Sequence, residues 1–204
     1  MYVRRAPFVL AAALFALAPA ARAAASQPAP SSGGSNQWGV LVGVEDLHES
    51  GVSLRGDLVL PLTPLSPVVG FAIVPSIGYT RISNSWSDPF ASVAGVSVNE
   101  SLNLFRGMAA ARFTFGHHPV IHPYADAGLG LYVASYSYEY HDAFYGTVAS
   151  SSKSDFGLVM RFAGGIAFQV SPSFALGAEL GFQPYFGGPD STSTNLLFSA
   201  SFRM

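Results

Sequence analysis

The sequence predicts an all-β protein, an eight-stranded antiparallel up-and-down transmembrane β-barrel. Apolar residues recur at every second position in eight segments, which is the period of a β-strand. Charged residues make up only 11% of the chain, yet beyond the N-terminus no apolar run approaches the roughly 20 residues of a membrane-spanning helix. The chain therefore carries its apolar character in short alternating pieces.

The N-terminus has the pattern of an export signal. Arg4 and Arg5 precede the apolar segment 6–18, and Ala21-Arg22-Ala23 is a small-x-small cleavage site. An uncleaved anchor is the alternative, although the apolar segment is short for a spanning helix. The predicted parts are a secretory signal peptide at 1–23, a flexible Pro/Ser/Gly linker at 24–36 and the barrel at 37–204.

The first four strands each have one apolar face and one face of small or polar residues. In the fourth, the alternation slips at 102–104, which predicts a β-bulge. The predicted ranges are 38–45, 52–62, 70–80 and about 102–115.

The last four strands repeat this pattern. In PYADAGLGLY, at 123–132, Ala125 to Leu131 form an apolar face at alternate positions, and Asp126 lies among glycines on the other face. The predicted ranges are about 123–138, 156–170, 174–182 and 195–204.

The connections differ between the two ends of the predicted barrel. Compact turns are expected at 62–69, 116–122 and 171–173, and longer loops at 81–99, 139–154 and 183–195. The connection at 45–51 is short although it lies at the loop end. A partly extended second long loop would raise the strand count to ten.

The two faces of the strands indicate a membrane barrel. A soluble barrel places long polar side chains on its outer face, but this chain has a single lysine, Lys153, and it falls in a predicted loop. In lipid the assignment is reversed, and apolar residues face outward while polar residues face the lumen. A soluble ligand-binding barrel with the opposite assignment is the alternative.

Aromatic residues near the strand ends fit the interfacial girdles of such barrels. The predicted interfacial aromatics are Trp38, Phe113, Phe115, Phe174 and Phe202 at the turn end, and Tyr79, Phe156 and Phe182 at the loop end.

PYADAGLGLY is similar to the Pro-Tyr-x-x-x-Gly-x-Gly pattern of small outer-membrane β-barrels of the OmpA-like, OmpX-like and opacity-protein type. SPSFALGAELGF, at 171–182, resembles their penultimate hairpin with its inward glutamate, here Glu179. The resemblance implies an outer-membrane location, contact with outer-membrane lipid and lipopolysaccharide, and insertion by the outer-membrane assembly machinery. Members usually end in an aromatic residue, whereas this chain ends Phe202-Arg203-Met204.

With the apolar face outward, most strand charges fall in the lumen, where an eight-stranded barrel has room only for side chains. We expect a salt-bridged plug, with a direct Arg112–Asp126 pair and a middle layer of Arg106, Arg161 and Glu179. A narrow proton or ion channel is the alternative. The predicted lumen charge network is Glu45, Arg55, Asp57, Arg106, Arg112, Asp126, Arg161, Glu179 and Arg203.

Other chemistry is weakly supported by the sequence. His117, His118 and His122 cluster near a turn, where a solvated turn is a better interpretation than a metal site. Serine-rich segments lack a nearby histidine in the arrangement of outer-membrane deacylases, so no catalytic residue and no cofactor is predicted, with a lipid A-modifying enzyme as the alternative.

The long loops carry aromatic residues that suit contact with lipopolysaccharide or a protein partner, or simple loop packing. These are Trp86, Phe90, Tyr140, Phe144, Tyr145, Tyr185 and Phe186. With a net charge of −2 the chain is not suited to nucleic acid. The sequence thus predicts a monomeric cell-envelope protein with a structural or surface-interaction role.

Overall fold

A computed structural model describes residues 35–47, 49–62, 64–66, 68–86, 96–116, 118–142, 146–187 and 191–204, so the predicted signal peptide lies outside the described residues. Eight antiparallel strands form one closed barrel in which β8 pairs with β1, as predicted. The alternative of ten strands is wrong. The strands are β1 (Gln37–Asp46), β2 (Ser50–Pro61), β3 (Val69–Trp86), β4 (Val96–Phe115), β5 (Ile121–Asp142), β6 (Gly146–Ser171), β7 (Phe174–Phe186) and β8 (Ser191–Arg203).

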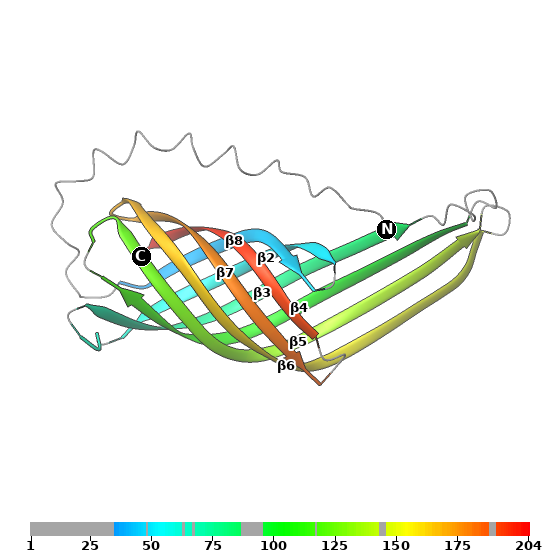
Figure 1. Cartoon of the computed structure of the whole chain (residues 1–204), viewed down its shortest axis with the longest axis horizontal. Helices are drawn as coiled ribbons and strands as arrows, with labels where there is room; N and C mark the ends of the chain where they lie inside the picture. The colour runs from blue at the N-terminus through cyan, green and yellow to red at the C-terminus, as the bar shows by residue number, and fades with distance from the viewer. Residues whose placement is uncertain are drawn as a thin grey trace, which may run out of the picture.

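The strands differ greatly in length. β3 to β6 have 18 to 26 residues, whereas β1, β2, β7 and β8 have 10 to 13. The long strands therefore continue past the closed ring at the loop end (Figure 1). We call this part the projecting sheet, made of residues 82–86, 96–102, 136–142 and 146–157. The described residues contain no helix long and apolar enough to cross a membrane.

The projecting sheet corrects the predicted strand ends. Much of the expected loops at 81–99 and 139–154 is strand, because these polar residues continue the hydrogen-bonded ladder of their neighbours. The expected bulge at 102–104 is also wrong, since β4 keeps a continuous register with both neighbours. The alternation slips there because Leu104 faces the lumen, where it is buried.

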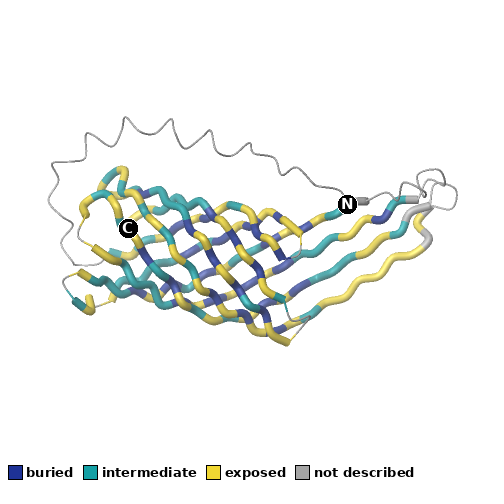
Figure 2. The backbone as a smooth tube through the Cα atoms, viewed as in Figure 1, coloured by how far each residue is buried: buried dark blue, intermediate teal, exposed yellow. Residues whose placement is uncertain are grey.

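The outward face of the barrel is apolar and the lumen is filled, as the reversed assignment predicts. Ile77, Leu180 and Phe156 are 75%, 65% and 61% exposed, while Arg161 and Glu45 in the lumen are 0% exposed. Buried and exposed residues alternate along the strands (Figure 2). This arrangement suits a barrel surrounded by lipid, in which every strand finds its hydrogen-bond partners within the ring.

All eight predicted interfacial aromatics lie on the outward-facing set of positions. Several form contacts with one another: the ring centroids of Trp38 and Phe202 are 4.8 Å apart, and those of Phe174 and Phe202 are 4.9 Å apart. Higher on the barrel, Tyr79 packs on Phe105 at 4.7 Å. Five of the eight are exposed and Tyr79, Phe113 and Phe174 are half-buried.

Candidate functional site: the charged lumen

The turn-side half of the lumen holds a network of six charged residues. Arg55 lies at its centre and donates to two carboxylates. Its Nη1 is 2.7 Å from Glu179 Oε1, and its Nε is 2.8 Å from Asp57 Oδ1. Arg55 lies on β2 and Glu179 on β7, two strands that are not neighbours in the ring, so this ion pair crosses the lumen.

The Arg112–Asp126 pair expected from the sequence is present in the same network. Arg112 and Asp126 are direct cross-strand partners on β4 and β5. Arg112 donates to both carboxylate oxygens, with Nε–Oδ1 at 2.8 Å and Nη2–Oδ2 at 2.7 Å. The Arg112 guanidinium also lies 4.2 Å from the ring centroid of Tyr124, whose hydroxyl donates to Glu179 at 3.1 Å. The bidentate pairing of Arg112 with Asp126 is the strong form of an arginine–carboxylate ion pair.

Arg161 completes the turn-side network. It is fully buried and donates through Nη2 to Asp126 Oδ2, so Asp126 accepts from two arginines. Its Nε and Nη1 have no hydrogen-bond partner among the described residues. The network is electrically neutral, because three arginines face three carboxylates: Arg55, Arg112 and Arg161, and Asp57, Asp126 and Glu179.

A second, separate charge site lies on the loop side and contains one pair. Arg106 Nη1 is 2.6 Å from Glu45 Oε1, and Arg106 Nη2 is 2.7 Å from Glu45 Oε2. Neutral side chains complete the site. Thr80, Ser193 and Tyr185 donate to the Glu45 carboxylate at 2.6, 2.7 and 3.0 Å. Burying an ion pair is costly unless such hydrogen bonds satisfy its remaining lone pairs and protons.

An apolar cluster packs on the loop side of this pair. Tyr185 links the two, because its hydroxyl bonds Glu45 while its ring packs edge-on against Tyr132 at 5.1 Å. The buried members of the cluster are Leu47, Ile82, Leu104, Met108, Tyr132, Ala134, Val159 and Tyr185. Glycine makes room for the large rings, since a Cβ at Gly157 would meet the Tyr132 ring and hydroxyl at 2.8 and 2.9 Å.

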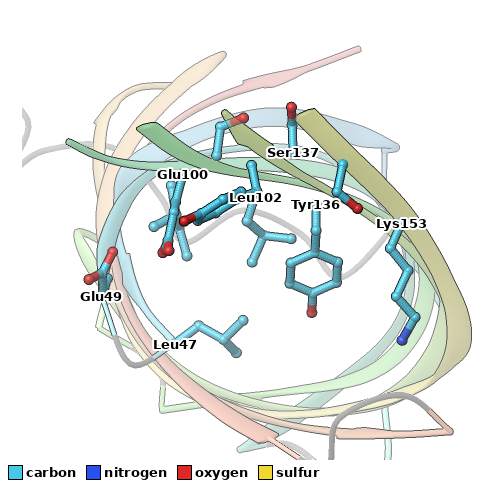
Figure 3. Close-up of a pocket in the computed structure, with 11 residues that line it drawn as sticks. Leu47, Glu49, Glu100, Leu102, Tyr136, Ser137 and Lys153 are labelled. Carbon is cyan, nitrogen blue, oxygen red and sulfur yellow. The ribbon is translucent and has the colours of Figure 1, made fainter. Parts of the chain in front are cut away.

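Above the cluster, the loop-side mouth of the barrel is a recess of about 280 Å³. Leu47, Leu102 and Tyr136 lie in it, with Glu49, Glu100 and Lys153 around them (Figure 3). Leu47 also belongs to the apolar cluster, so the recess ends on that cluster before it reaches the buried charges.

Below the network, the turn-side mouth is a vestibule of about 340 Å³ lined by Arg112, His122 and Arg203 among others. Arg203 is exposed there and forms no ion pair with a described residue, so its predicted place in the buried network is wrong. The reason is its position at the last residue of β8, at the open end of the ring. The described residues contain no group of three or more potential metal ligands.

Two further expectations are corrected. Arg106, Arg161 and Glu179 do not form one layer, because Arg106 pairs with Glu45 and Glu179 pairs mainly with Arg55.

Tyr185 is not a surface residue. Strand β7 continues past Pro184, and Tyr185 is 3% exposed inside the lumen. Tyr185 lies an even number of residues after the inward-facing Glu179 on the same strand, and this spacing could have predicted that its side chain faces the lumen.

The remaining predicted surface aromatics are only partly described. Phe186 is exposed on the outer face of β7, and Tyr140 is half-buried on β5. Phe90, Phe144 and Tyr145 lie outside the described residues, as does the side chain of Trp86.

No model of a known protein family matches this chain, and no curated protein is detectably similar in sequence. Solved structures are similar. Neisserial surface protein A is 16% identical, with a TM-score of 0.54 over 83% of this chain and 96% of that chain. A major outer membrane protein from Thermus thermophilus is 12% identical, with a TM-score of 0.53 over 84% and 100%.

The outer membrane enzyme PagL is also similar, at 14% identity over 82% of this chain and 99% of that chain, with a lower TM-score of 0.45. At such identities the likeness shows the fold alone. The chain has the fold of the small outer-membrane β-barrels. This agrees with the resemblance found in the sequence.

Proposed function

We propose that this protein is a small outer-membrane β-barrel with a closed lumen and a structural or surface-interaction role in the cell envelope. One observation carries the proposal: an apolar outer surface surrounds a lumen occupied by paired charges and an apolar cluster. An eight-stranded ring leaves little space beyond its side chains. The side chains in the lumen therefore serve to hold the ring together. Contacts with other molecules are made by the parts of the protein outside the lumen.

The projecting sheet supports a surface-interaction role. In it, β4 and β5 each extend seven residues beyond the ring, roughly 23 Å of strand at about 3.3 Å per residue, and β6 extends twelve. Polar residues such as Ser151, Lys153 and Glu139 are exposed on it. Such a sheet stands clear of the lipid and presents a firm surface to lipopolysaccharide headgroups or a protein partner.

The membrane location and orientation can be tested together, because the chain has no cysteine. We expect the variant S152C, on the projecting sheet, to react with a membrane-impermeant maleimide in intact cells. The matched variant S173C, in the turn between β6 and β7, should react only after the outer membrane is opened. Recovery of the protein in the soluble periplasm would contradict the location, and the reverse labelling pattern would contradict the orientation.

The closed lumen distinguishes this role from a narrow channel. We expect the refolded protein to give no conductance in planar lipid bilayers, since both the ion pairs and the apolar cluster block the lumen. A reproducible single-channel step would favour the channel instead.

The proposal also distinguishes this protein from a lipid A-modifying enzyme. We expect the mass spectrum of lipid A to be the same in cells with and without the protein. A mass difference of one acyl chain would favour the enzyme.

A further inference from the structure

An apolar groove of about 680 Å³ lies on the outer surface of the barrel, over β1 to β5. Its centre is a row of cross-strand partners in which Gly56 and Gly107 lie on either side of Ile77. Val40 and Leu131 close the row at its two ends. Ile77 is 75% exposed, so it stands as a ridge with a hollow on each side.

The two glycines create the groove without being required by the fold. A Cβ at Gly107 would meet nothing within 4 Å, and a Cβ at Gly56 would meet only Ile77 Cγ1, at 3.8 Å. By contrast, a Cβ at the lumen-facing Gly128 would meet backbone and side-chain atoms of Ala110 at 2.7 to 2.8 Å. Larger side chains would fit at Gly56 and Gly107. Because both positions are glycine, the surface has room for part of another molecule.

Toward the loop end, the outer surface changes from apolar to polar within two rows of residues. The next row of partners, Tyr79, Phe105 and Val133, is still apolar. The row after it contains Arg81, Asn103 and Ser135. These rows are two residues apart along each strand, about 7 Å. The Tyr79 hydroxyl joins them by donating to Asn103 Oδ1 at 2.7 Å.

Arg81 differs from the other cations of the described strands. Arg55, Arg106, Arg112, Arg161, Arg203 and Lys153 occupy lumen-facing positions, whereas Arg81 is exposed on the outward face beside the exposed Val52. Arg81 forms no ion pair with a described residue. An exposed arginine at the boundary between lipid and water is suited to an anionic headgroup, which it can bind through two parallel hydrogen bonds.

We infer that this surface is a binding site for one phosphorylated glycolipid of the outer leaflet, of the lipid A class. An acyl chain lies in the hollow beside Ile77, a phosphate binds Arg81, and sugar hydroxyls meet Asn103 and Ser135. A glycolipid fits better than a simple phospholipid because the polar row offers neutral hydrogen-bonding side chains next to the single cation. The inference rests on the proposed outer-membrane location, which places the loop end in the outer leaflet.

Native mass spectrometry of the full mature chain in detergent tests the site, with diphosphorylated lipid A as the probe and phosphatidylglycerol and phosphatidylcholine as competitors. We expect the wild type to prefer lipid A over both. R81Q should bind lipid A about tenfold more weakly, because a hydrogen bond to a charged group is lost. G107L should also weaken binding about tenfold, because the leucine side chain fills the hollow beside Ile77 in which the acyl chain lies.

G164L is the matched control for G107L. Gly164 is also an exposed, outward-facing glycine with room for a side chain, but it lies on β6, away from Arg81. This variant should bind lipid A as the wild type does. Equal binding of lipid A and phosphatidylglycerol, an unchanged affinity in R81Q, or an equal loss in G164L and G107L would overturn the site.

Folding is measured separately, by the shift in electrophoretic mobility that barrels show on heating. A folded chain without the expected lipid preference overturns the lipid site and leaves the barrel proposal intact. A chain that does not fold in detergent, or that is recovered in the soluble periplasm, contradicts the proposed function itself.

Discussion

The two charge sites of the lumen satisfy buried charge in different ways. On the loop side, Glu45 and Arg106 form a single pair, and neutral hydroxyl and amide groups complete it. On the turn side, six charged residues pair mostly with one another, and Asp126 is shared by two arginines. Among the described residues, the first site has no second carboxylate to replace Glu45, whereas in the second site other carboxylates lie within reach of each arginine.

The number of ion pairs at a buried site is therefore a poor guide to how much one residue contributes to stability. Removing one partner of an isolated buried pair leaves an uncompensated charge, which costs more than the pair itself contributes. In a network the same removal shifts the orphaned charge toward the remaining partners. The effect of losing a charge should therefore decrease as the remaining groups compensate for it more completely.

The largest effect is expected at the isolated pair. E45A should lower the free energy of unfolding by about 4 kcal/mol, because Arg106 remains buried with neutral acceptors only. Urea unfolding in detergent micelles, followed by circular dichroism, measures the loss. The double variant E45L/R106L removes both charges and should lose about 1 kcal/mol or less. A double variant as unstable as E45A would contradict this explanation.

A smaller effect is expected in the network. D126A should lower the free energy of unfolding by about 2 kcal/mol, since Arg112 still has Asp57 at 3.5 Å and Arg161 still has Glu179 at 4.0 Å. The same urea experiment applies. An unchanged midpoint would contradict the Arg112–Asp126 pair, and a loss as large as that of E45A would contradict the redundancy.

The smallest effect is expected outside the ring. Lys153 and Asp155 occupy the same inward-facing set of positions on β6, but the Lys153 side chain is 73% exposed, so water solvates its charge. K153Q should change the free energy of unfolding by about 0.5 kcal/mol or less. The difference between the losses of unfolding free energy in K153Q and E45A then measures the effect of enclosing a charge in the lumen. A loss in K153Q larger than that in D126A would contradict this effect.

Much of the fold follows from local sequence. The alternation of apolar and small residues predicts eight strands and which face is outward, because one face must meet lipid along the whole membrane span. Arg112 and Asp126 could be paired in advance because a single tight hairpin joins their strands. This pair needed no knowledge of how the ring closes.

The rest of the site depends on closure of the ring, which no local pattern encodes. Glu45 and Arg106 are 61 positions apart, and Arg55 and Glu179 are 124 apart. The strand extensions of β3 to β6 were missed because outside the lipid neither face must be apolar. The loss of alternation there reflects a change of solvent, and the β-structure continues.

The unequal strand lengths leave the projecting sheet with two open edges. Residues 146–157 of β6 pair with β5 but, in the described part of the chain, with no strand on the other side. An open edge is a template on which a second molecule can add a strand. Here residues 150–154 read Ser-Ser-Ser-Lys-Ser, four small hydroxyl side chains and one cation. A lysine on an open edge discourages such pairing, so copies crowded in one membrane can lie side by side without joining into a continuous sheet.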